Sequence, residues 1–358
     1  MRETLVVSDV HLGVLRSGGT TPNSAMELRK YLQESLYLLL MQHTDKNCLF
    51  NGDVFDTFSS PLSDVMVFYT TAAEWLERSN GNLILGRGNH DIPKDNSKMS
   101  SFDFVGAILK ARFPERVQVV TEPAMVLPGV WQVPHMPNQD LFNLELERIP
   151  DDASLVLVHA NYDNNFAVEA DHSLNVSVEQ ARKITSNGAT LLFGHEHQKR
   201  IMLGGKVYIA GNQWPSSVAD CQHNPDNKKF AHIIGEDFQI TPVLTWDGHD
   251  GWGEVDWDNL ATGADNDTPF VRVGGHATAE QAPEAIKAIA EFRKRSSAFV
   301  VSNAVKVAGM KDMEQIETSV EEIRQFDVLA YLLEQLDPEQ AAVVKELLES
   351  DEPIREAA

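Results

Sequence analysis

The chain has 358 residues and a hydrophobic content of 42%, enough for one large domain with a smaller addition, or for two domains. Its 53 acidic and 30 basic residues give a formal charge of −23, which opposes nonspecific attraction to nucleic acid. No apolar run approaches the ~20 residues that span a bilayer, the N-terminus has no signal-peptide pattern, and a content of two cysteines argues against a disulfide framework. We therefore expect a cytoplasmic protein without a membrane anchor. If it handles DNA, it needs a local basic strip, bound cations or a basic partner.

The first third of the chain alternates short apolar strands with amphipathic helices. A strand over residues 4–7 precedes a helix whose start is predicted at the capping box Ser24-Ala25-Met26-Glu27. Further strands are predicted at Cys48 and Leu83, with a helix around residues 65–76 between them. This alternation favours crossover connections and a layered α/β core.

The middle of the chain predicts a second sheet. From about residue 117 to residue 133, short strands alternate with Pro and Gly turns, which suggests a more antiparallel arrangement. Two more strands end at His159 and His195, and residues 206–210 and 230–234 are further strands. We expect this first domain to cover residues 1–244.

The C-terminal third changes character. Residues 245–269 scatter tryptophans among Asp, Gly and Glu, which predicts an irregular acidic linker or, less simply, an aromatic ligand platform. Residues 270–310 predict a small strand–helix–strand domain with a helix capped by Thr278. Residues 311–358 predict a helical tail. Its apolar stripes pack on each other or on the core, or else bind a partner helix; the residues are Phe326, Leu329, Leu333 and Leu336, then Val343, Val344, Leu347 and Leu348.

Polar side chains follow five apolar runs of the predicted sheets. In chain order they are Asp9 and His11, Asp53, Asn89 with His90 and Asp91, His159, and His195 with His197. Open α/β sheets place their ligands just past the carboxyl ends of their strands. We therefore expect these side chains to meet at one rim, around Asp53.

The composition of this rim indicates metal ions. Asp9 and His11 are two residues apart, as are His195 and His197, so each pair can aim at one ion. Carboxylates with imidazoles suit manganese, iron or zinc better than calcium. The eight candidate ligands are too many for one ion and fit two ions that share a bridging carboxylate: Asp9, His11, Asp53, Asn89, His90, His159, His195 and His197. Two ions about 3.5–4 Å apart can stabilise the attacking and leaving oxygens of phosphoester hydrolysis.

In order and spacing, these motifs resemble the calcineurin-like metallophosphoesterases over residues 1–240: Asp9-Val10-His11, Gly52-Asp53, Gly88-Asn89-His90-Asp91, His159 and Gly194-His195-Glu196-His197. The resemblance implies a four-layer α/β/β/α sandwich. It implies one divalent metal held by Asp9, His11, Asp53 and His197. It implies a second metal held by Asp53, Asn89, His159 and His195, with a water between the ions as the nucleophile. Manganese is the metal that we favour.

The same resemblance gives roles to three further residues. His90 would face the substrate and protonate the leaving oxygen or stabilise the transition state. Asp91 would orient the ring of His90. Arg87 would contact phosphate or, alternatively, be a solvated loop residue.

A narrower resemblance is to the SbcD-type nuclease subunit, a relative of the meiotic-recombination nuclease. It is carried by Ser8-Asp9-Val10-His11-Leu12-Gly13 and Gly52-Asp53-Val54-Phe55-Asp56, and more loosely by residues 208–230. It implies a DNA exonuclease or endonuclease of repair or recombination, with a DNA-capping domain at 270–310. It also implies a tail that binds an SMC-like coiled-coil ATPase, and it leaves room for a homodimer. Two alternatives stay open: a phosphodiesterase or pyrophosphatase of small substrates, and a scaffold without catalytic activity.

Overall fold

The computed structural model of the chain describes residues 2–14, 19–93, 98–164, 173–222, 228–248, 251–262 and 268–308. The chain divides into two compact units, Met1–Lys306 and Val307–Ala358. Apart from the last residue of strand β19, every element named below belongs to the first unit. The predicted helical tail at 311–358 lies outside the described residues.

The first sheet has six strands and carries the N-terminal motifs. Its order is β14 (Ile240–Asp247), β13 (Lys228–Ile234), β1 (Thr4–Val7), β2 (Asn47–Asn51), β3 (Leu83–Gly86) and β4 (Val117–Val120). Strands β1 to β4 are parallel, while β13 is antiparallel to both β1 and β14. The carboxyl ends of β1, β2 and β3 therefore lie along one edge.

The second sheet also has six strands. Its order is β11 (Arg200–Met202), β12 (Val207–Ile209), β10 (Thr190–Gly194), β7 (Leu155–His159), β6 (Val130–Val133) and β5 (Ala124–Leu127). The prediction that the second sheet is more antiparallel than the first is wrong, because β6, β7, β10 and β12 run parallel and only the edge strands β5 and β11 reverse. The run that was expected to open this sheet, β4, belongs instead to the first one.

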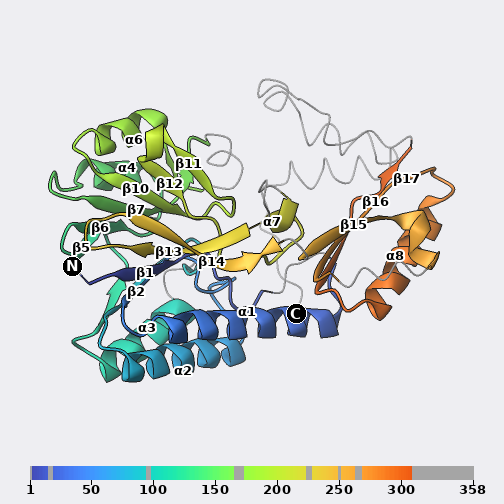
Figure 1. Ribbon diagram of the computed structural model, residues 1–358, viewed down its shortest axis with the longest axis horizontal. Helices are drawn as coiled ribbons and strands as arrows, with labels where there is room; N and C mark the ends of the chain where they lie inside the picture. Colours follow the sequence, from blue (N-terminus) through green and yellow to red (C-terminus); the bar gives the residue numbers. More distant parts are fainter. Residues whose placement is uncertain are drawn as a thin grey trace, which may run out of the picture. The chain divides into compact units, whose positions relative to one another are not determined.

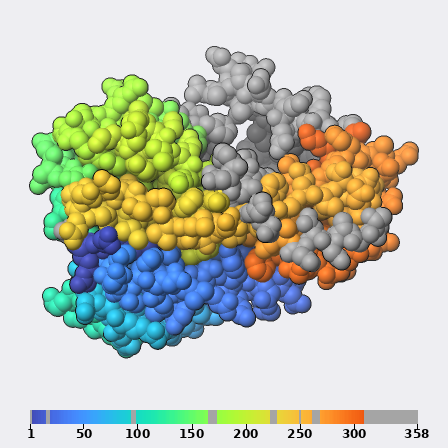
Figure 2. Space-filling view, viewed as in Figure 1, coloured from blue at the N-terminus to red at the C-terminus, as the bar shows by residue number. Residues whose placement is uncertain are grey.

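The two sheets face each other and helices cover their outer faces (Figure 1). Helices α1 (Pro22–Gln42), α2 (Leu62–Arg78) and α3 (Ser101–Arg112) lie against the first sheet, and α4 (Gln139–Glu147) and α6 (Val178–Thr185) against the second. Between the sheets, Val6, Leu49 and Ile84 pack with Leu157 and Leu192 in one buried cluster. The expected four-layer α/β/β/α sandwich is confirmed. In Figure 2 the gold surface of β13 and β14 separates the blue N-terminal helices from the green second half.

Short elements complete this part of the chain. They are β8 (Asn161–Tyr162), which pairs with β9 (Asn175–Val176), the 3-10 turn Leu203–Gly205, and α7 (Ala219–Gln222). Helix α1 begins earlier than predicted. Its N-cap is Thr21, whose side chain accepts from the backbone N–H of Ser24, while Pro22 opens the first turn.

A second, smaller sheet follows the sandwich. It has the order β15 (Trp252–Asp256), β16 (Phe270–Gly274) and β18 (Val300–Asn303), and its helix is α8 (Ala282–Arg295). The prediction of an irregular linker is wrong for Trp252–Asp256, because this segment pairs in parallel with β16; the 3-10 turn Trp257–Thr262 follows it. The short strands β17 (His276–Ala277) and β19 (Lys306–Val307) pair with each other.

The smaller sheet packs on the sandwich through aromatic and aliphatic side chains. Phe270 and Val300 join the buried cluster beneath the first sheet. The ring of Phe299 lies 5.3 Å from that of Tyr31 on α1, and the backbone N–H of Val301 donates to the carbonyl of Gly19. Both cysteines are buried and form no disulfide. Among the described residues, no helix combines the length and apolar character needed to cross a membrane.

Candidate metal centre

The loops after β1 and β2 run side by side and hold their ligands in a strained backbone conformation. The backbone N–H of Asp9 donates to the carbonyl of Gly52, and that of His11 donates to the carbonyl of Asp53, both at 3.1 Å. Asp9, His11 and Asp53 have φ angles of 53°, 52° and 52°, and His195 has 89°. Such left-handed residues other than glycine cost about 1–3 kcal/mol each and concentrate at functional sites. The backbone strain thus marks the rim where the motifs meet.

Two motif glycines allow the ligands to approach each other. A Cβ atom on Gly88 would lie 2.1 Å from Oδ1 of Asp53, and one on Gly52 would lie 2.0 Å from Nδ1 of His159. No side chain fits at either position. The glycines of both motifs are therefore required by close packing around Asp53.

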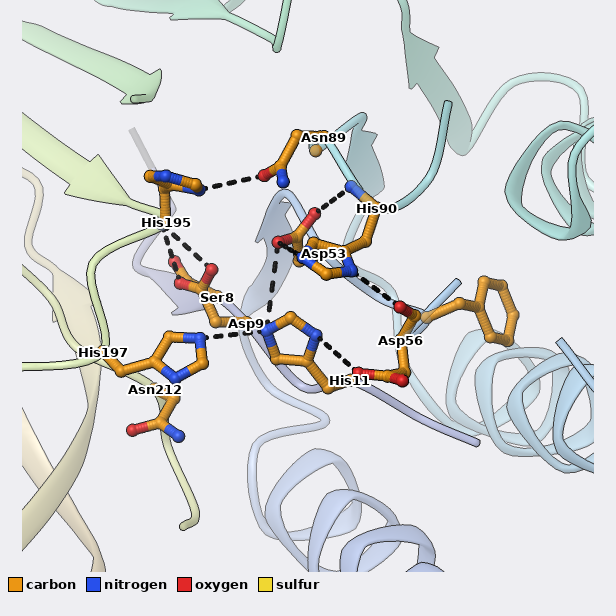
Figure 3. A network of polar contacts seen from close by, with 12 residues as sticks. Ser8, Asp9, His11, Asp53, Asp56, Asn89, His90, His195, His197 and Asn212 are labelled. Atoms are coloured by element: carbon orange, nitrogen blue, oxygen red, sulfur yellow. Dashed lines mark hydrogen bonds and ion pairs between the residues drawn. The ribbon is translucent and has the colours of Figure 1, made fainter. Parts of the chain in front are cut away.

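Asp9, His11 and His197 form the first group of potential ligands (Figure 3). Nε2 of His11 lies 3.0 Å from Nε2 of His197. Because Nδ1 of His197 donates to a carboxylate oxygen of Asp220 at 2.9 Å, its Nε2 presents a lone pair toward His11. The carboxylate of Asp9 is buried and accepts from the backbone N–H of His195 at 2.9 and 3.1 Å. We call this group position one.

Asp53, Asn89, His159 and His195 form the second group. Oδ1 of Asn89 lies 2.9 Å from both Nε2 of His159 and Nδ1 of His195, and Nε2 of His159 lies 3.3 Å from Oδ2 of Asp53. Nδ1 of His159 donates to the backbone carbonyl of Asn51 at 2.8 Å, so Nε2 is the ring atom directed at these oxygens. We call this group position two.

Asp53 lies between the two positions. Its Oδ2 is 3.3 Å from Nε2 of His159 in position two and 3.9 Å from Nε2 of His11 in position one. Its Oδ1 accepts from the backbone N–H of His90 at 2.9 Å. The side chain is 2% exposed. This geometry fits the predicted bridging carboxylate.

The convergence of lone pairs tests whether the site fits metal ions. Buried acceptors that face each other at hydrogen-bond distance need a cation between them. The pKa values of two histidines follow from the same crowding of acceptors. Burial lowers the pKa of both His11 and His159, but neighbouring carboxylates outweigh burial and raise each pKa to about 9: those of Asp56, Asp53 and Asp9 for His11, and those of Asp53 and Asp9 for His159. The residues therefore fit divalent ions that prefer mixed oxygen and nitrogen ligands.

The remaining titratable groups respond to the same crowding. Burial raises the pKa of the Asp9 carboxyl. Burial alone would also raise that of Asp53, but the rings of His159 and His11 hold its pKa well below the usual range. Burial, together with the neighbouring His159, lowers the pKa of His195 to about 3. The cluster therefore keeps the ring of His195 neutral and favours the protonated form of His11 and His159.

His90 lies at the outer side of position one. Its Nδ1 donates to the carbonyl of Asp56 at 2.6 Å, and its ring meets that of His11 edge to face at 4.9 Å. The side chain is 24% exposed, far more than that of Asp53 or His159. Because Nδ1 is engaged, Nε2 is the atom through which His90 can exchange a proton.

The predicted role of Asp91 needs correction. Its carboxylate accepts from the backbone N–H groups of Gly88, Val54 and Phe55, rather than from the ring of His90. Burial, together with the nearby Asp53, raises its pKa to about 7. Asp91 therefore fixes the turn that carries Asn89 and His90, and the carbonyl of Asp56 orients the His90 ring.

Arg87 lies at the end of β3. Nη2 of its guanidinium donates to the carbonyl of Thr121 at 3.3 Å, and its backbone bonds to Val120 and His135. The side chain is half-buried. These contacts fix Arg87 to the strand end, and the predicted contact with phosphate stays a prediction.

Three residues beside the ligands were missed by sequence reasoning. The carboxylate of Asp220 accepts a hydrogen bond from His197. Oδ1 of Asp56 lies 3.5 Å from Nδ1 of His11. The ring of His135 lies 6.3 Å from that of His159. His135 follows the end of β6, as the other motifs follow their strands, so the same rule would have found it. Asp220 had no such signal, because α7 reaches His197 only through the tertiary fold.

Comparison with known proteins agrees with this site. Residues 3–199 match the calcineurin-like phosphoesterase family, whose members use a dinuclear metal centre to hydrolyse phosphoesters. No curated protein matches the chain in sequence. Among solved structures, TT1561 of Thermus thermophilus is similar over 68% of this chain and 99% of its own, with 12% identity and a TM-score of 0.41. The matched region covers every predicted metal ligand and more than half of the chain, so the protein belongs to the calcineurin-like phosphoesterase family.

Proposed function

We propose that this phosphoesterase is a two-metal DNA nuclease of the SbcD type, which acts in repair or recombination. The observation that carries the proposal is the charge of the smaller sheet and its helix. Residues 268–308 hold six Lys or Arg and three Glu, in a chain whose formal charge is −23. Lys287, Lys294, Arg295 and Lys306 are exposed. These exposed basic side chains support the proposal, because DNA binding requires local positive charge.

The acidic charge is concentrated elsewhere. Residues 309–358 hold fourteen Asp or Glu and four Lys or Arg, which accounts for almost half of the excess negative charge. The remaining residues, 1–308, therefore carry a formal charge of −13 rather than −23.

The proposed chemistry divides between the ions and the protein. Two divalent ions, which we propose to be manganese, would supply Lewis-acid stabilisation of the phosphoester oxygens and lower the pKa of water. Asp9, His11, Asp53 and His197 would hold one ion, and Asp53, Asn89, His159 and His195 the other. His90 would exchange a proton with the leaving oxygen through Nε2.

A direct comparison of substrates tests the proposal. Chelated protein, reloaded with manganese, should cleave end-labelled linear DNA with much higher kcat/KM than a cyclic nucleotide or a nucleotide-lipid pyrophosphate. Turnover of either small substrate without cleavage of DNA would reject the nuclease assignment in favour of a small-substrate phosphodiesterase or pyrophosphatase.

Charge reversal on α8 tests the DNA surface separately. Lys287→Glu combined with Lys294→Glu should raise KM for DNA and flatten its salt dependence, because each lost phosphate contact lowers the slope of log K against log salt by about 0.9 for B-DNA. Hydrolysis of a small nitrophenyl phosphodiester should not change. Lys183→Glu on α6, another exposed lysine, is the matched control. Equal loss in both proteins would remove α8 from the DNA surface.

The partners remain part of the proposal. We propose that an SMC-like ATPase binds the tail at 311–358, which lies outside the described residues, and that the subunit is able to form a homodimer. Deleting residues 318–358 should abolish co-purification with the ATPase while leaving metal-dependent cleavage of short single strands. Loss of folding in the shortened protein would instead assign the tail to the core.

A further inference from the structure

The carboxylate of Asp220 fixes the position of one potential metal ligand, His197. Its Oδ1 accepts from Nδ1 of His197 at 2.9 Å. Its Oδ2 accepts from the backbone N–H groups of Ser216 and Ser217 at 2.9 and 3.0 Å, and from Oγ of Ser216 at 3.0 Å. The side chain is 6% exposed. Both carboxylate oxygens thus accept hydrogen bonds, which fix the carboxylate behind the ring of His197.

A buried lysine fixes the same ligand from the backbone. Nζ of Lys229 donates to the carbonyl of His197 at 3.0 Å and to Oδ1 of Asn212 at 2.6 Å. Lys229 is 3% exposed and lies on β13, where a register shift follows it. His197 is therefore held at its ring and at its backbone by groups from two different segments.

The other imidazole of position one also backs onto a carboxylate. Nδ1 of His11 lies 3.5 Å from Oδ1 of Asp56, whose side chain is 6% exposed. In Figure 3, His11 lies between Asp56 on one side and His197 on the other. Position one thus combines the carboxylate of Asp9 with two imidazoles that each face a second carboxylate.

Position two lacks these supports. Nδ1 of His159 donates to a neutral backbone carbonyl, that of Asn51, and Nδ1 of His195 faces the neutral amide of Asn89. Over the parts of the chain that the structure describes, Asp53 is the one carboxylate in contact with either ring. The two positions therefore differ in formal charge and in the basicity of their imidazoles.

We propose that position one binds its metal ion more tightly than position two, and that Asp220 is the positioning residue chiefly responsible. A carboxylate behind a ligating histidine fixes the tautomer and raises the basicity of the ring, and its loss lowers metal affinity by about 10–100-fold. The proposal rests on the two-metal assignment and is independent of the DNA substrate. The ions then load in order, and the concentration of available metal controls whether position two is filled.

Metal titration without substrate tests this proposal. Manganese added to the chelated protein should fill two classes of site, with a mononuclear paramagnetic signal first and a spin-coupled pair afterwards. Asp220→Asn should weaken the tight class by about 10–100-fold and leave the weak class unchanged. Asn89→Ala should abolish the weak class and retain the tight one. Asp103→Asn on α3, a carboxylate that bonds only locally to Ser100, is the matched control.

Two results would overturn the proposal. One is loss of the tight class in Asn89→Ala. The other is a tight class of unchanged affinity in a folded Asp220→Asn protein, with folding checked by circular dichroism. Because the Asn89→Ala arm does not depend on Asp220, it decides the order of binding even if Asp220→Asn fails to fold. Failure of DNA cleavage alone would leave the metal titration unaffected and would reject only the nuclease proposal.

Discussion

Nε2 of His11 and Nε2 of His197 face each other at 3.0 Å, although the two residues are 186 positions apart in the chain. His11 follows a strand of the first sheet and His197 follows a strand of the second. A cation between them would therefore join the two halves of the sandwich. Because such an ion binds only the folded chain, it also stabilises the fold.

Metal removal should accordingly lower the melting temperature as well as abolish activity. An ion present at 100 times its dissociation constant contributes about 2.7 kcal/mol to the free energy of unfolding. Calorimetry of chelated and manganese-reloaded protein measures the difference. Equal melting temperatures in the two states would contradict a metal site shared between the sheets.

Asp53→Asn should weaken both ions. Oδ2 of Asp53 lies near His159 of position two and His11 of position one, and the substitution removes its charge while keeping its size. Metal analysis after gel filtration should find less than one ion per chain. Two retained ions in an active Asp53→Asn protein would eliminate the bridging assignment.

His90→Gln should reduce kcat and leave metal content unchanged. His90 belongs to neither position one nor position two, although it forms a further group of potential ligands with His11 and Asp56, and positioned acids typically contribute 10²–10⁴-fold to the rate. His276→Gln, at an exposed histidine of the smaller sheet, is the control and should keep full activity. Loss of an ion from the His90→Gln protein would assign His90 to the ligands instead.

Gly88→Ala should lower metal affinity. The added methyl group would lie 2.1 Å from Oδ1 and 2.3 Å from the backbone nitrogen of Asp53, so the bridging carboxylate has to move. Gly274→Ala on β16 has its nearest contact at 3.3 Å, with the flexible end of Glu254, and serves as the control. Isothermal titration with manganese compares the two. Equal affinities would show that the turn relaxes without moving Asp53.

His232 should make folding stability depend on pH. Burial, with a smaller effect of Lys199, lowers its pKa from 6.5 to about 4. Below pH 6.5 the unfolded chain binds a proton that the folded chain refuses, so stability is full above this pH and is lost as pH falls toward 4. Between pH 7 and pH 5 the loss is about 2 kcal/mol.

The variant His232→Leu isolates this contribution. Urea unfolding of the chelated protein should show a smaller loss of stability between pH 7 and pH 5 in the variant than in the parent. Subtracting the pH dependence of the variant from that of the parent removes the contribution of the other histidines, because these titrate in both proteins. Identical pH dependence would mean that His232 accepts its proton within the fold.

The sequence predicted the rim well because its signal is local. Each ligand follows directly on the strand that positions it, and the parallel pairing of β1, β2 and β3 brings the ends of neighbouring strands together. The contacts behind the ligands were not predictable in this way. Asp220 and Lys229 reach His197 from segments more than 20 residues away, and no spacing rule connects them.

Errors in the predicted fold have similar causes. β15 was missed because it is an edge strand of the small sheet that buries only part of its surface, so its sequence Trp252-Gly253-Glu254-Val255-Asp256 lacks the apolar run of a central strand. The direction of the second sheet was wrong because strand pairing depends on how crossovers pack, which short Pro and Gly turns do not reveal.

The place of β1 in its sheet has a consequence for synthesis of the protein. β1 lies between β2, made about forty residues later, and β13, made more than two hundred residues later. While the ribosome is still translating the second sheet, one edge of β1 is unpaired, and His195 and His197 do not yet exist. A prematurely terminated product that ends before them carries the N-terminal motifs but only part of each metal position. We therefore expect translation errors of this kind to release a fragment without a complete metal centre.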